Sequence, residues 1–281
     1  MTVRGRFHVG MSGWVYPPWR GVFYPKGLTQ KNELAYAASH VNSIEINGSF
    51  YSMHKPSSWQ NWRDSTPDDF VFSAKGPRFI THIRRLDDVH GALANFFSQG
   101  ILALGPKLEC VLWQLPPSLE FEPTLVENFL KELPHTTTAA VALAEQRGER
   151  MKGREYLETD AERPLRHSIE VRHSSFDDER FYELLSEHGV ASVLADTAGK
   201  WPRLDRATAD FSYVRLHGDK KIYESGYDDE ALDAWAARLG EWLAAGHDAY
   251  VYFDNDVKVR APIDAMGLIA RLSSHNDSSA S

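Results

Sequence analysis

Residues 168–196 decide the fold, and they read SIEVRHSSFDDERFYELLSEHGVASVLAD. Two short apolar runs, Ser168–Arg172 and Ala191–Asp196, flank a segment of helical length, Asp177–His188. This succession is the pattern of a β-α-β unit, which joins two parallel strands through a helix. A chain that repeats the unit is an α/β protein with a parallel sheet.

Further runs of the same kind lie on both sides of this unit and bring the total to eight. They are Phe7–Met11, Val41–Ile46, Phe70–Lys75, Leu108–Leu115, Phe211–His217 and Ala249–Asp254. Eight parallel strands close into a (β/α)8 barrel, and 281 residues is an ordinary length for one barrel. The sequence therefore predicts an α/β protein with a single TIM-like barrel over residues 1–272.

Segments with helical length or apolar spacing separate most of the predicted strands. Besides Asp177–His188, they are Asn32–Ser39, Trp59–Ser65, Ala92–Leu104, Thr124–Leu133, Asp229–Ala245 and Pro262–Leu272. The connection after Asp196 differs, because residues 199–204 form a short stretch that contains Pro202. We expect one helix to be missing or degenerate between the sixth and seventh strands.

Two segments depart from the barrel pattern. Residues 145–166 are densely charged with both signs and interrupt a β-α-β connection, so we interpret them as an insertion. The insertion is expected to form either a solvated surface helix or disordered excursion, or a lid or partner-binding arm. Residues 273–281 are Ser-rich and lack an apolar anchor, which predicts a disordered tail.

Composition and charge exclude several classes of protein. The net charge of −8 disfavours broad nucleic-acid binding, which needs Lys and Arg to neutralise phosphates. Cys110 is the only cysteine, so an intramolecular disulfide and a multi-cysteine metal site are excluded. The N-terminus leads into a short strand instead of a signal-peptide core, and no run is long enough to span a bilayer. We therefore expect a soluble, cytoplasmic protein without a membrane partner.

Polar and aromatic residues gather where the predicted strands end. In a parallel barrel the carboxyl ends of the strands and the following loops form one face, from which catalytic groups project. The residues at these positions are Ser12, Trp14, Glu45, Asn47, Tyr51, Lys75, Gln114, Glu170, Arg172, His173, Asp196, Arg215, His217, Asp254 and Asn255. Because side chains alternate along a strand, Glu170 and Arg172 should share one face while His173 points away. Arg215 and His217 should likewise share a face.

The charged residues of this face admit three interpretations. In an acid/base site, Lys75, His217 and a carboxylate such as Glu45 or Glu170 exchange protons or stabilise charge. Arg172 and Arg215 then hold an anion. A second possibility is a divalent-metal site, for Mg²⁺, Mn²⁺ or Zn²⁺. Its candidate ligands are Glu45, Glu170, Asp196, His217 and Asp254. In the third, the charges only pair with one another inside the barrel mouth.

The aromatic residues near these strand ends also admit more than one role. Trp14 and Tyr51 lie in aromatic clusters after the first two strands. Such rings suit stacking against a sugar or a base, but they also suit a lid over the barrel or packing in the core. Sequence motifs of phosphate-binding loops, zinc proteases and hydrolase nucleophile elbows are absent from the chain.

The strand-end strings resemble the YecE-like family, also called domain of unknown function 72, from Gly10 to Leu272. The matching strings include Gly10-Met11-Ser12-Gly13-Trp14, Glu45-Ile46-Asn47, Phe72-Ser73-Ala74-Lys75 with Thr81-His82, Gln114-Leu115-Pro116-Pro117, Glu170-Val171-Arg172-His173, Tyr213-Val214-Arg215-Leu216-His217-Gly218 and Tyr252-Phe253-Asp254-Asn255-Asp256. The resemblance implies a TIM-like barrel and brings His82 into the expected binding set, but the family has no established reaction to carry over. This chain departs from the family pattern at Met11, where Thr is usual, and at Phe176, where Trp is usual.

The leading hypothesis is an enzyme that acts on a small polar, anionic or sugar-like substrate. A hydrolase, lyase or isomerase would fit an acid/base site, with Asp254 and Asn255 orienting the ligand. The alternative is a non-catalytic scaffold that binds nucleic acid or a protein partner through the barrel mouth or residues 145–166. The cofactor, beyond the divalent metal considered above, is left open.

Overall fold

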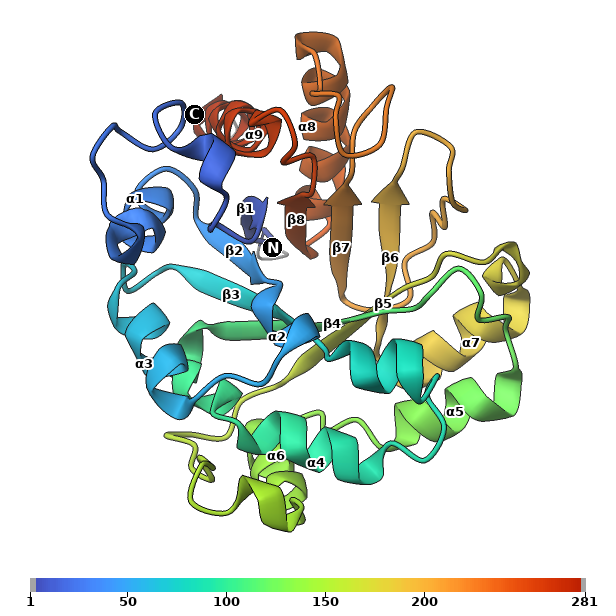
Figure 1. Ribbon diagram of the computed structural model, residues 1–281. Coiled ribbons are helices and arrows are strands. Elements are labelled where there is room, and N and C mark those ends of the chain that lie inside the picture. The colour runs from blue at the N-terminus through green and yellow to red at the C-terminus, as the bar shows by residue number, and fades with distance from the viewer. Residues whose placement is uncertain (1–3, 279–281) are drawn as a thin grey trace.

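The computed structural model describes residues 4–278 and shows a closed barrel of eight parallel strands in sequence order (Figure 1). The strands are β1 (Phe7–Ser12), β2 (Ser43–Ile46), β3 (Val71–Lys75), β4 (Leu108–Gln114), β5 (Arg166–Glu170), β6 (Ala191–Asp196), β7 (Phe211–Leu216) and β8 (Asp248–Phe253). The barrel closes where β1 pairs with β8 in parallel register, from Phe7 opposite Ala249 to Met11 opposite Phe253. The predicted TIM-like barrel is confirmed, and β6 has the bounds that the sequence indicated.

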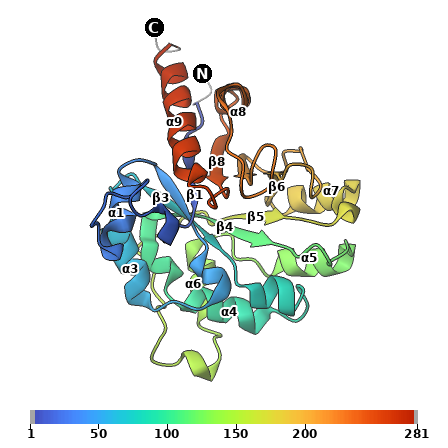
Figure 2. The same ribbon diagram turned by 45° about the horizontal axis from the view of Figure 1, so that its top comes forward.

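Helices lie outside the ring of strands (Figure 2). The α-helices are α1 (Glu33–Ala38), α2 (Gly48–Tyr51), α3 (Pro56–Asp64), α4 (His90–Ser98), α5 (Pro123–Lys131), α6 (Thr137–Ala144), α7 (Glu179–Glu187), α8 (Asp229–Ala244) and α9 (Arg260–Ser278). Shorter helical turns are η1 (Pro17–Trp19), η2 (Gln30–Asn32), η3 (Phe79–Ile83), η4 (Ile101–Lys107), η5 (Glu149–Met151) and η6 (Ser174–Phe176). Among residues 4–278, no helix is long and apolar enough to cross a membrane.

Local sequence explains most of the helix boundaries. Helices α7 and α8 begin after Asp178 and Asp228, whose carboxylates accept hydrogen bonds from backbone amides of the first turn. The connection from β6 to β7 contains no helix, as its length and Pro202 predicted. Helix α6 was not predicted although four of its eight residues are alanine, because its apolar residues do not recur on one face with helical spacing. Its first turn is capped by Thr136 Oγ1, which accepts a hydrogen bond from Ala139 N at 3.1 Å.

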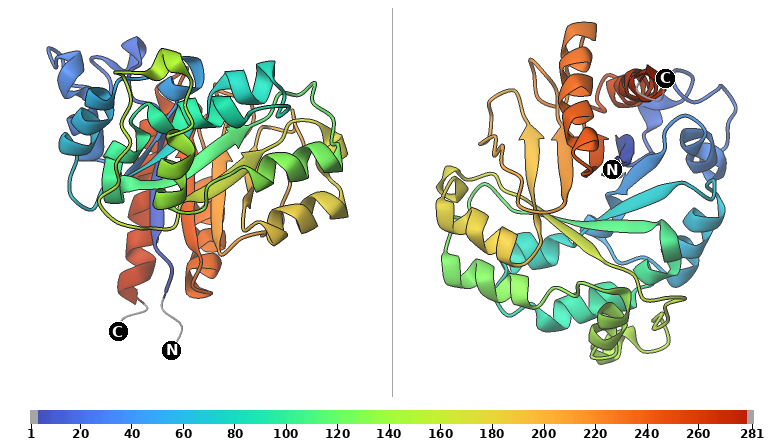
Figure 3. Two further views of the ribbon diagram at one scale, coloured as in Figure 1. Left: turned by 90° about the horizontal axis from the view of Figure 1, so that it is seen from below. Right: turned by 180° about the vertical axis from the view of Figure 1, so that it is seen from behind.

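The predicted tail is wrong for Ser273–Ser278, because α9 continues through Ser278. The last helix lies against β1, so the two ends of the α/β succession meet (Figure 3). Leu268 and Leu272 are buried on that side and anchor the helix. Once a helix is anchored in this way, each added residue gains a backbone hydrogen bond at little nucleation cost. Residues 279–281 of the predicted tail lie outside the described residues.

The charged segment 145–166 follows an ordered path on the outside of the barrel, beside α4 and α6 (Figure 1). Its backbone is tied to α4, since Tyr156 N donates to Ser98 O at 2.8 Å and Gly148 N donates to Asn95 Oδ1 at 2.9 Å. Met151 is its buried anchor. The segment is therefore neither a surface helix nor a disordered excursion, apart from the single turn η5.

Large side chains fill the barrel interior beneath the carboxyl-terminal face. Tyr213, Tyr250 and Tyr252 belong to one buried cluster inside the barrel. At the amino-terminal end, Arg166 donates to the hydroxyl of Tyr250, which donates in turn to Glu109 Oε2 at 2.7 Å. The interior is thus a packed core, as expected for this fold, and a functional site must lie above it.

Candidate active site

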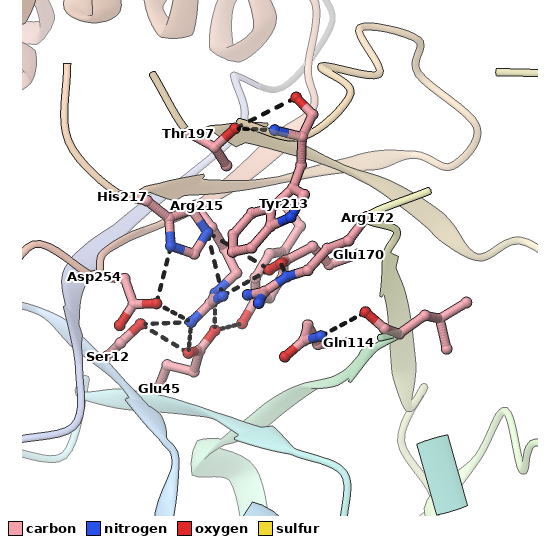
Figure 4. Close-up of polar contacts among 12 residues, drawn as sticks. Ser12, Glu45, Gln114, Glu170, Arg172, Thr197, Tyr213, Arg215, His217 and Asp254 are labelled. Carbon is pink, nitrogen blue, oxygen red and sulfur yellow. Dashed lines mark hydrogen bonds and ion pairs between the residues drawn. The ribbon is translucent and has the colours of Figure 1, made fainter. Parts of the chain in front are cut away.

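A buried arginine, Arg215 on β7, joins polar side chains from several strands (Figure 4). Its Nε and Nη2 donate to the two carboxylate oxygens of Glu45 at 3.1 and 2.9 Å. Its Nη1 donates to Glu170 Oε2 at 2.6 Å, and Nη2 also donates to Asp254 Oδ2 at 3.0 Å and Ser12 Oγ at 3.1 Å. One guanidinium therefore links the ends of β1, β2, β5, β7 and β8.

The charges of this network are fixed by their mutual contacts. Burial opposes ionisation of Glu170, but the guanidinium groups of Arg172 and Arg215 override it and hold the carboxyl pKa well below its usual range. Asp254 follows the same rule, since Arg215 and His217 outweigh burial and lower its pKa. These contacts favour a counter-ion at Glu170 over the proton-exchanging group that the sequence suggested.

The same network explains why the predicted metal set is not assembled. The candidate ligands were Glu45, Glu170, Asp196, His217 and Asp254. Arg215 contacts all three of the carboxylates Glu45, Glu170 and Asp254, while Asp196 accepts a hydrogen bond from Tyr227 at 3.1 Å. Among residues 4–278, no group of three or more His, Cys, Asp or Glu side chains could hold a metal ion. Glu45, Glu170 and Asp254 therefore follow the third interpretation, in which charges pair with one another inside the barrel mouth.

A pocket of about 480 Å³ opens above the network. It is lined by Tyr16, Asn47, Phe50, Tyr51, Lys75, His82, Gln114, Arg172, Tyr223, Asp254 and Asp256. Every one of these residues lies at the carboxyl end of a strand or in the loop or short helix that follows it. The polar pocket is thus on the face where the sequence placed it. No residue of 145–166 lines it, so that segment does not form its lid within the described chain.

Lys75, the last residue of β3, is the cation that this pocket leaves without a counter-ion. Its side chain is only 8% exposed, and its Nζ lies 4.4 Å from the centre of the Phe50 ring. Among residues 4–278, no carboxylate oxygen lies within 4 Å of that nitrogen. Burial, followed by the positive charge of Arg215, lowers the pKa of Lys75 from 10.5 to about 8.

Asp256 lines the same pocket and is shifted in the opposite direction. Burial, followed by the negative charge of Asp254, raises the pKa of Asp256 to about 6. His82 stays neutral at pH 7, because burial and the nearby charge of Lys75 lower its pKa to about 4. The pocket therefore contains a carboxyl group and an amine whose pKa values lie on either side of neutrality.

Arg172 supplies a second cation to the pocket. Its Nε donates to Glu170 Oε1 at 2.8 Å, and its guanidinium carbon lies 3.8 Å from the centre of the Trp201 ring. Within residues 4–278, its two terminal nitrogens have no hydrogen-bond acceptor. A guanidinium fixed by stacking and by one carboxylate is preorganised to bind an anion with its remaining donors.

The predicted site residues lie at two levels, on the pocket wall and beneath the pocket floor. Those that line the pocket are Asn47, Tyr51, Lys75, His82, Gln114, Arg172 and Asp254. Those that lie buried beneath it are Ser12, Glu45, Glu170, Arg215 and His217. His217 has both nitrogens close to the network, with Nδ1 3.0 Å from Asp254 Oδ2 and Nε2 3.4 Å from Arg215 Nη1. It supports the floor of the pocket and does not line it.

Three further residues that the sequence placed in the site form hydrogen bonds outside the pocket instead. His173 Nδ1 accepts the backbone amide of Ser175 at 3.2 Å and caps η6, on the other side of β5 from Glu170. Asn255 Nδ2 donates to Asp264 Oδ2 at 2.9 Å, which ties the loop after β8 to α9. Asp196 is bound to Tyr227, as described above. Trp14, also predicted, lies in a neighbouring apolar pocket.

Sequence reasoning did not assign Tyr223 or Asp256 to the site. Tyr223 lies in the long loop between β7 and α8, where no periodic pattern marks it, and a backbone hydrogen bond from Tyr223 N to His217 O folds it inward. Asp256 follows Asp254 by two residues in the run after β8. The alternation of side chains along an extended chain could have placed both carboxylates on one side.

Comparisons of the sequence and of the structure with known proteins point to the same protein family. A family model described as "Protein of unknown function DUF72" matches residues 8–281. The chain is 31% identical over 131 residues to the UPF0759 protein YecE of Escherichia coli, and the match covers 45% of this chain and 44% of YecE. It therefore spans less than half the length of that curated relative.

Solved structures of the same family share the fold. A DUF72 family protein from Thermotoga maritima has 25% identity and a TM-score of 0.75, with 95% of this chain and 99% of that chain covered. A DUF72 family protein from Enterococcus faecalis has 15% identity and a TM-score of 0.70, with 95% of each chain covered. The second likeness shows the fold alone.

Proposed function

The chain belongs to the DUF72 family of proteins of unknown function, and from that premise we propose that it is an enzyme that transfers protons on a small anionic substrate. The substrate would lie in the polar pocket above Arg215. The observation that supports this proposal is the presence of Lys75 and Asp256 in one pocket, with pKa values near 8 and near 6. Groups that titrate near the working pH are the most effective proton donors and acceptors.

Each residue would have a distinct task. Arg172 binds the anionic group of the substrate, since its terminal nitrogens have no acceptor in the described chain. Asp256 is ionised above about pH 6 and accepts a proton, while Lys75 is protonated below about pH 8 and donates one. Such a pair suits a lyase or an isomerase, which remove a proton from the substrate and return one to it. It would also suit a hydrolase in which the proton acceptor activates a water molecule.

The buried network would position these groups without exchanging protons. Arg215 holds Asp254 beside the pocket, and the negative charge of Asp254 contributes to the raised pKa of Asp256. Arg215 also contributes to the lowered pKa of Lys75. His217, predicted as catalytic, becomes a positioning residue for Asp254. A fixed arrangement of charges below the pocket is the kind of preorganisation that stabilises charge developing in a reaction.

The first test is ligand binding measured by thermal shift. The purified protein is heated with inorganic phosphate, ribose 5-phosphate, glucose 6-phosphate and pyruvate, because a ligand that binds only the folded state raises the melting temperature. We expect at least one of these anions to stabilise the wild type and to lose its effect in Arg172→Gln. Arg180→Gln, on the exposed surface of α7, serves as the matched control and should respond like the wild type.

The second test concerns the chemistry. Stabilising compounds and their close analogues are incubated with the protein in ²H₂O, and proton NMR follows exchange at carbon. Exchange should be lost in Lys75→Met and in Asp256→Asn, and its rate should fall below about pH 6 and above about pH 8. Absence of stabilisation by every anion, or stabilisation that Arg172→Gln leaves unchanged, would contradict the proposed site.

A further inference from the structure

A second pocket, of about 290 Å³, adjoins the polar pocket. The two pockets share three lining residues, Tyr16, Asn47 and Tyr51. The second pocket is mainly apolar, and its other walls include Trp14 and Trp62. The two pockets are therefore neighbours that meet at these three residues, with the cations on one side and the aromatic walls on the other.

The aromatic walls are rigid. Trp14 packs edge to face on Trp62, with ring centres 5.4 Å apart and planes at 81°. His54 packs on the same Trp62 ring at 4.9 Å and 76°. Tyr51, at the boundary between the pockets, is 73% exposed although it is a large aromatic side chain. Fixed aromatic faces beside an exposed ring suit the stacking of a flat ligand ring.

Asn47 supplies a polar group at the boundary. Its Oδ1 is shielded from solvent and has no hydrogen-bond partner among residues 4–278. A buried acceptor without a partner is costly, so a ligand N–H at this position would gain a hydrogen bond that the protein leaves unmade. The neighbouring Nδ2 can donate to the same ligand, and an Asn amide pairs in this two-point manner with the edge of a nucleobase.

From this arrangement we propose that the substrate is a nucleoside monophosphate, with its base in the aromatic pocket against Asn47 and its phosphate beside Arg172 and Lys75. The inference rests on the proposed function, because the phosphate end occupies the same polar pocket. The two cations match the double negative charge of a phosphate monoester. The volumes of the two pockets together lie in the range of about 300–1,000 Å³ that small-molecule sites occupy.

The test compares ligands that contain both ends with ligands that contain one. Isothermal titration calorimetry measures AMP, GMP, CMP and UMP, with ribose 5-phosphate as the probe that lacks the base and adenosine as the probe that lacks the phosphate. We expect at least one nucleotide to bind about tenfold or more tightly than ribose 5-phosphate, the gain that stacking of a base gives. Trp14→Leu should remove this advantage and leave the affinity for ribose 5-phosphate unchanged, because Trp14 lines only the aromatic pocket. Asn47 lines both pockets, so Asn47→Ala should weaken nucleotide binding by a larger factor than it weakens ribose 5-phosphate binding.

Trp242→Leu provides the matched control, because Trp242 lies on α8 outside both of these pockets. It should keep the preference for nucleotides. Asn47→Ala removes few contacts, so it tests the inference even if Trp14→Leu does not fold.

The outcomes separate the two proposals. If all four nucleotides bind no more tightly than ribose 5-phosphate, or if Asn47→Ala and every folded variant at Trp14 keep the preference, the inference is overturned while the proposed function stands. If neither ribose 5-phosphate nor any nucleotide binds, both fail. Tight nucleotide binding that persists in Arg172→Gln would overturn the placement of the phosphate.

Discussion

Replacement of Arg215 by methionine should destabilise the protein more than any surface ion-pair variant. The guanidinium is fully buried and donates five hydrogen bonds, to Ser12, Glu45, Glu170 and Asp254. Methionine has a similar length, but it leaves buried carboxylates without their cation. Removing one partner of a buried ion pair costs about 3–5 kcal/mol, mainly because the remaining charge stays buried and unpaired.

The expected fall in melting temperature follows from the size of the chain. An unfolding entropy of about 2.1 cal/mol/K per residue, over 281 residues, gives about 0.6 kcal/mol per degree. A loss of 3–5 kcal/mol therefore lowers the melting temperature by about 5–8 °C. Urea unfolding followed by tryptophan fluorescence gives the free energy directly. Arg180→Met is the matched control and should lose less than about 1 kcal/mol of stability. The Arg180 side chain is 40% exposed, and within residues 4–278 its ion pairs are with Glu183 and Glu187 on α7.

The pH dependence gives a further check on the cause. In the wild type, Glu170 and Asp254 have lowered pKa values, so their contribution to stability is present above the ordinary carboxyl pKa and is lost as the pH falls through the folded values. Arg215→Met removes the strongest favourable interaction of Asp254 and one of the two guanidinium contacts of Glu170, which keeps its bond to Arg172. The difference between wild type and variant should therefore shrink as the pH falls below about 4. A variant that loses no more stability than Arg180→Met, or a difference independent of pH, would refute the reasoning.

Three other variants test separate features. Lys75→Met should stabilise the fold at pH 7 by about 1–2 kcal/mol in urea unfolding. A lysine pKa of about 8 instead of 10.5 means that burying the charged amine costs about 3 kcal/mol, and methionine removes that cost. Loss of the contact between the amine and the Phe50 ring offsets part of the gain. The gain should fade between pH 8 and 10.5, where the folded lysine is already neutral, and a loss of stability at pH 7 would contradict the assigned burial penalty. Asn255→Ala should lower the free energy of unfolding by about 1–2 kcal/mol in the same assay, because the hydrogen bond to Asp264 is lost. It should leave ribose 5-phosphate binding unchanged, and weakened binding would show that Asn255 contacts the ligand. Asp228→Ala should lower stability by about 1 kcal/mol through loss of the α8 cap, and an unchanged melting temperature would show that the cap contributes nothing.

The placement of the charged groups limits which chemistry the pocket can perform. Glu170 and Asp254 contact Arg215 and have lowered pKa values, whereas the pKa of Asp256 is raised to about 6 by burial and by the charge of Asp254. Two aspartates only two residues apart thus have opposite pKa shifts. Burial raises the pKa of Asp256 and the negative charge of Asp254 adds to that shift, whereas at Asp254 the guanidinium of Arg215 and the side chain of His217 outweigh burial.

Local sequence determined the barrel and the face on which the pocket lies. Most strands are short apolar runs, and a change from strand-like to helical spacing marks where they end. Strand β5, which reads RHSIE, is the exception. These patterns repeat along the chain, so they can be recognised without knowledge of what packs on what. The missing helix after Asp196 was predictable for the same reason, because length and proline content are local properties.

Tertiary structure alone decided how the polar strand ends meet. Glu45 and Arg215 are 170 positions apart, and no local pattern indicates that they form an ion pair. That pairing turns the carboxylates predicted as metal ligands into counter-ions. Of the two cations that line the pocket, Lys75 has no carboxylate within 4 Å among residues 4–278, whereas Arg172 is paired with Glu170. Burial and distance between groups from different strands set these pKa values, and both exist only once the barrel has closed.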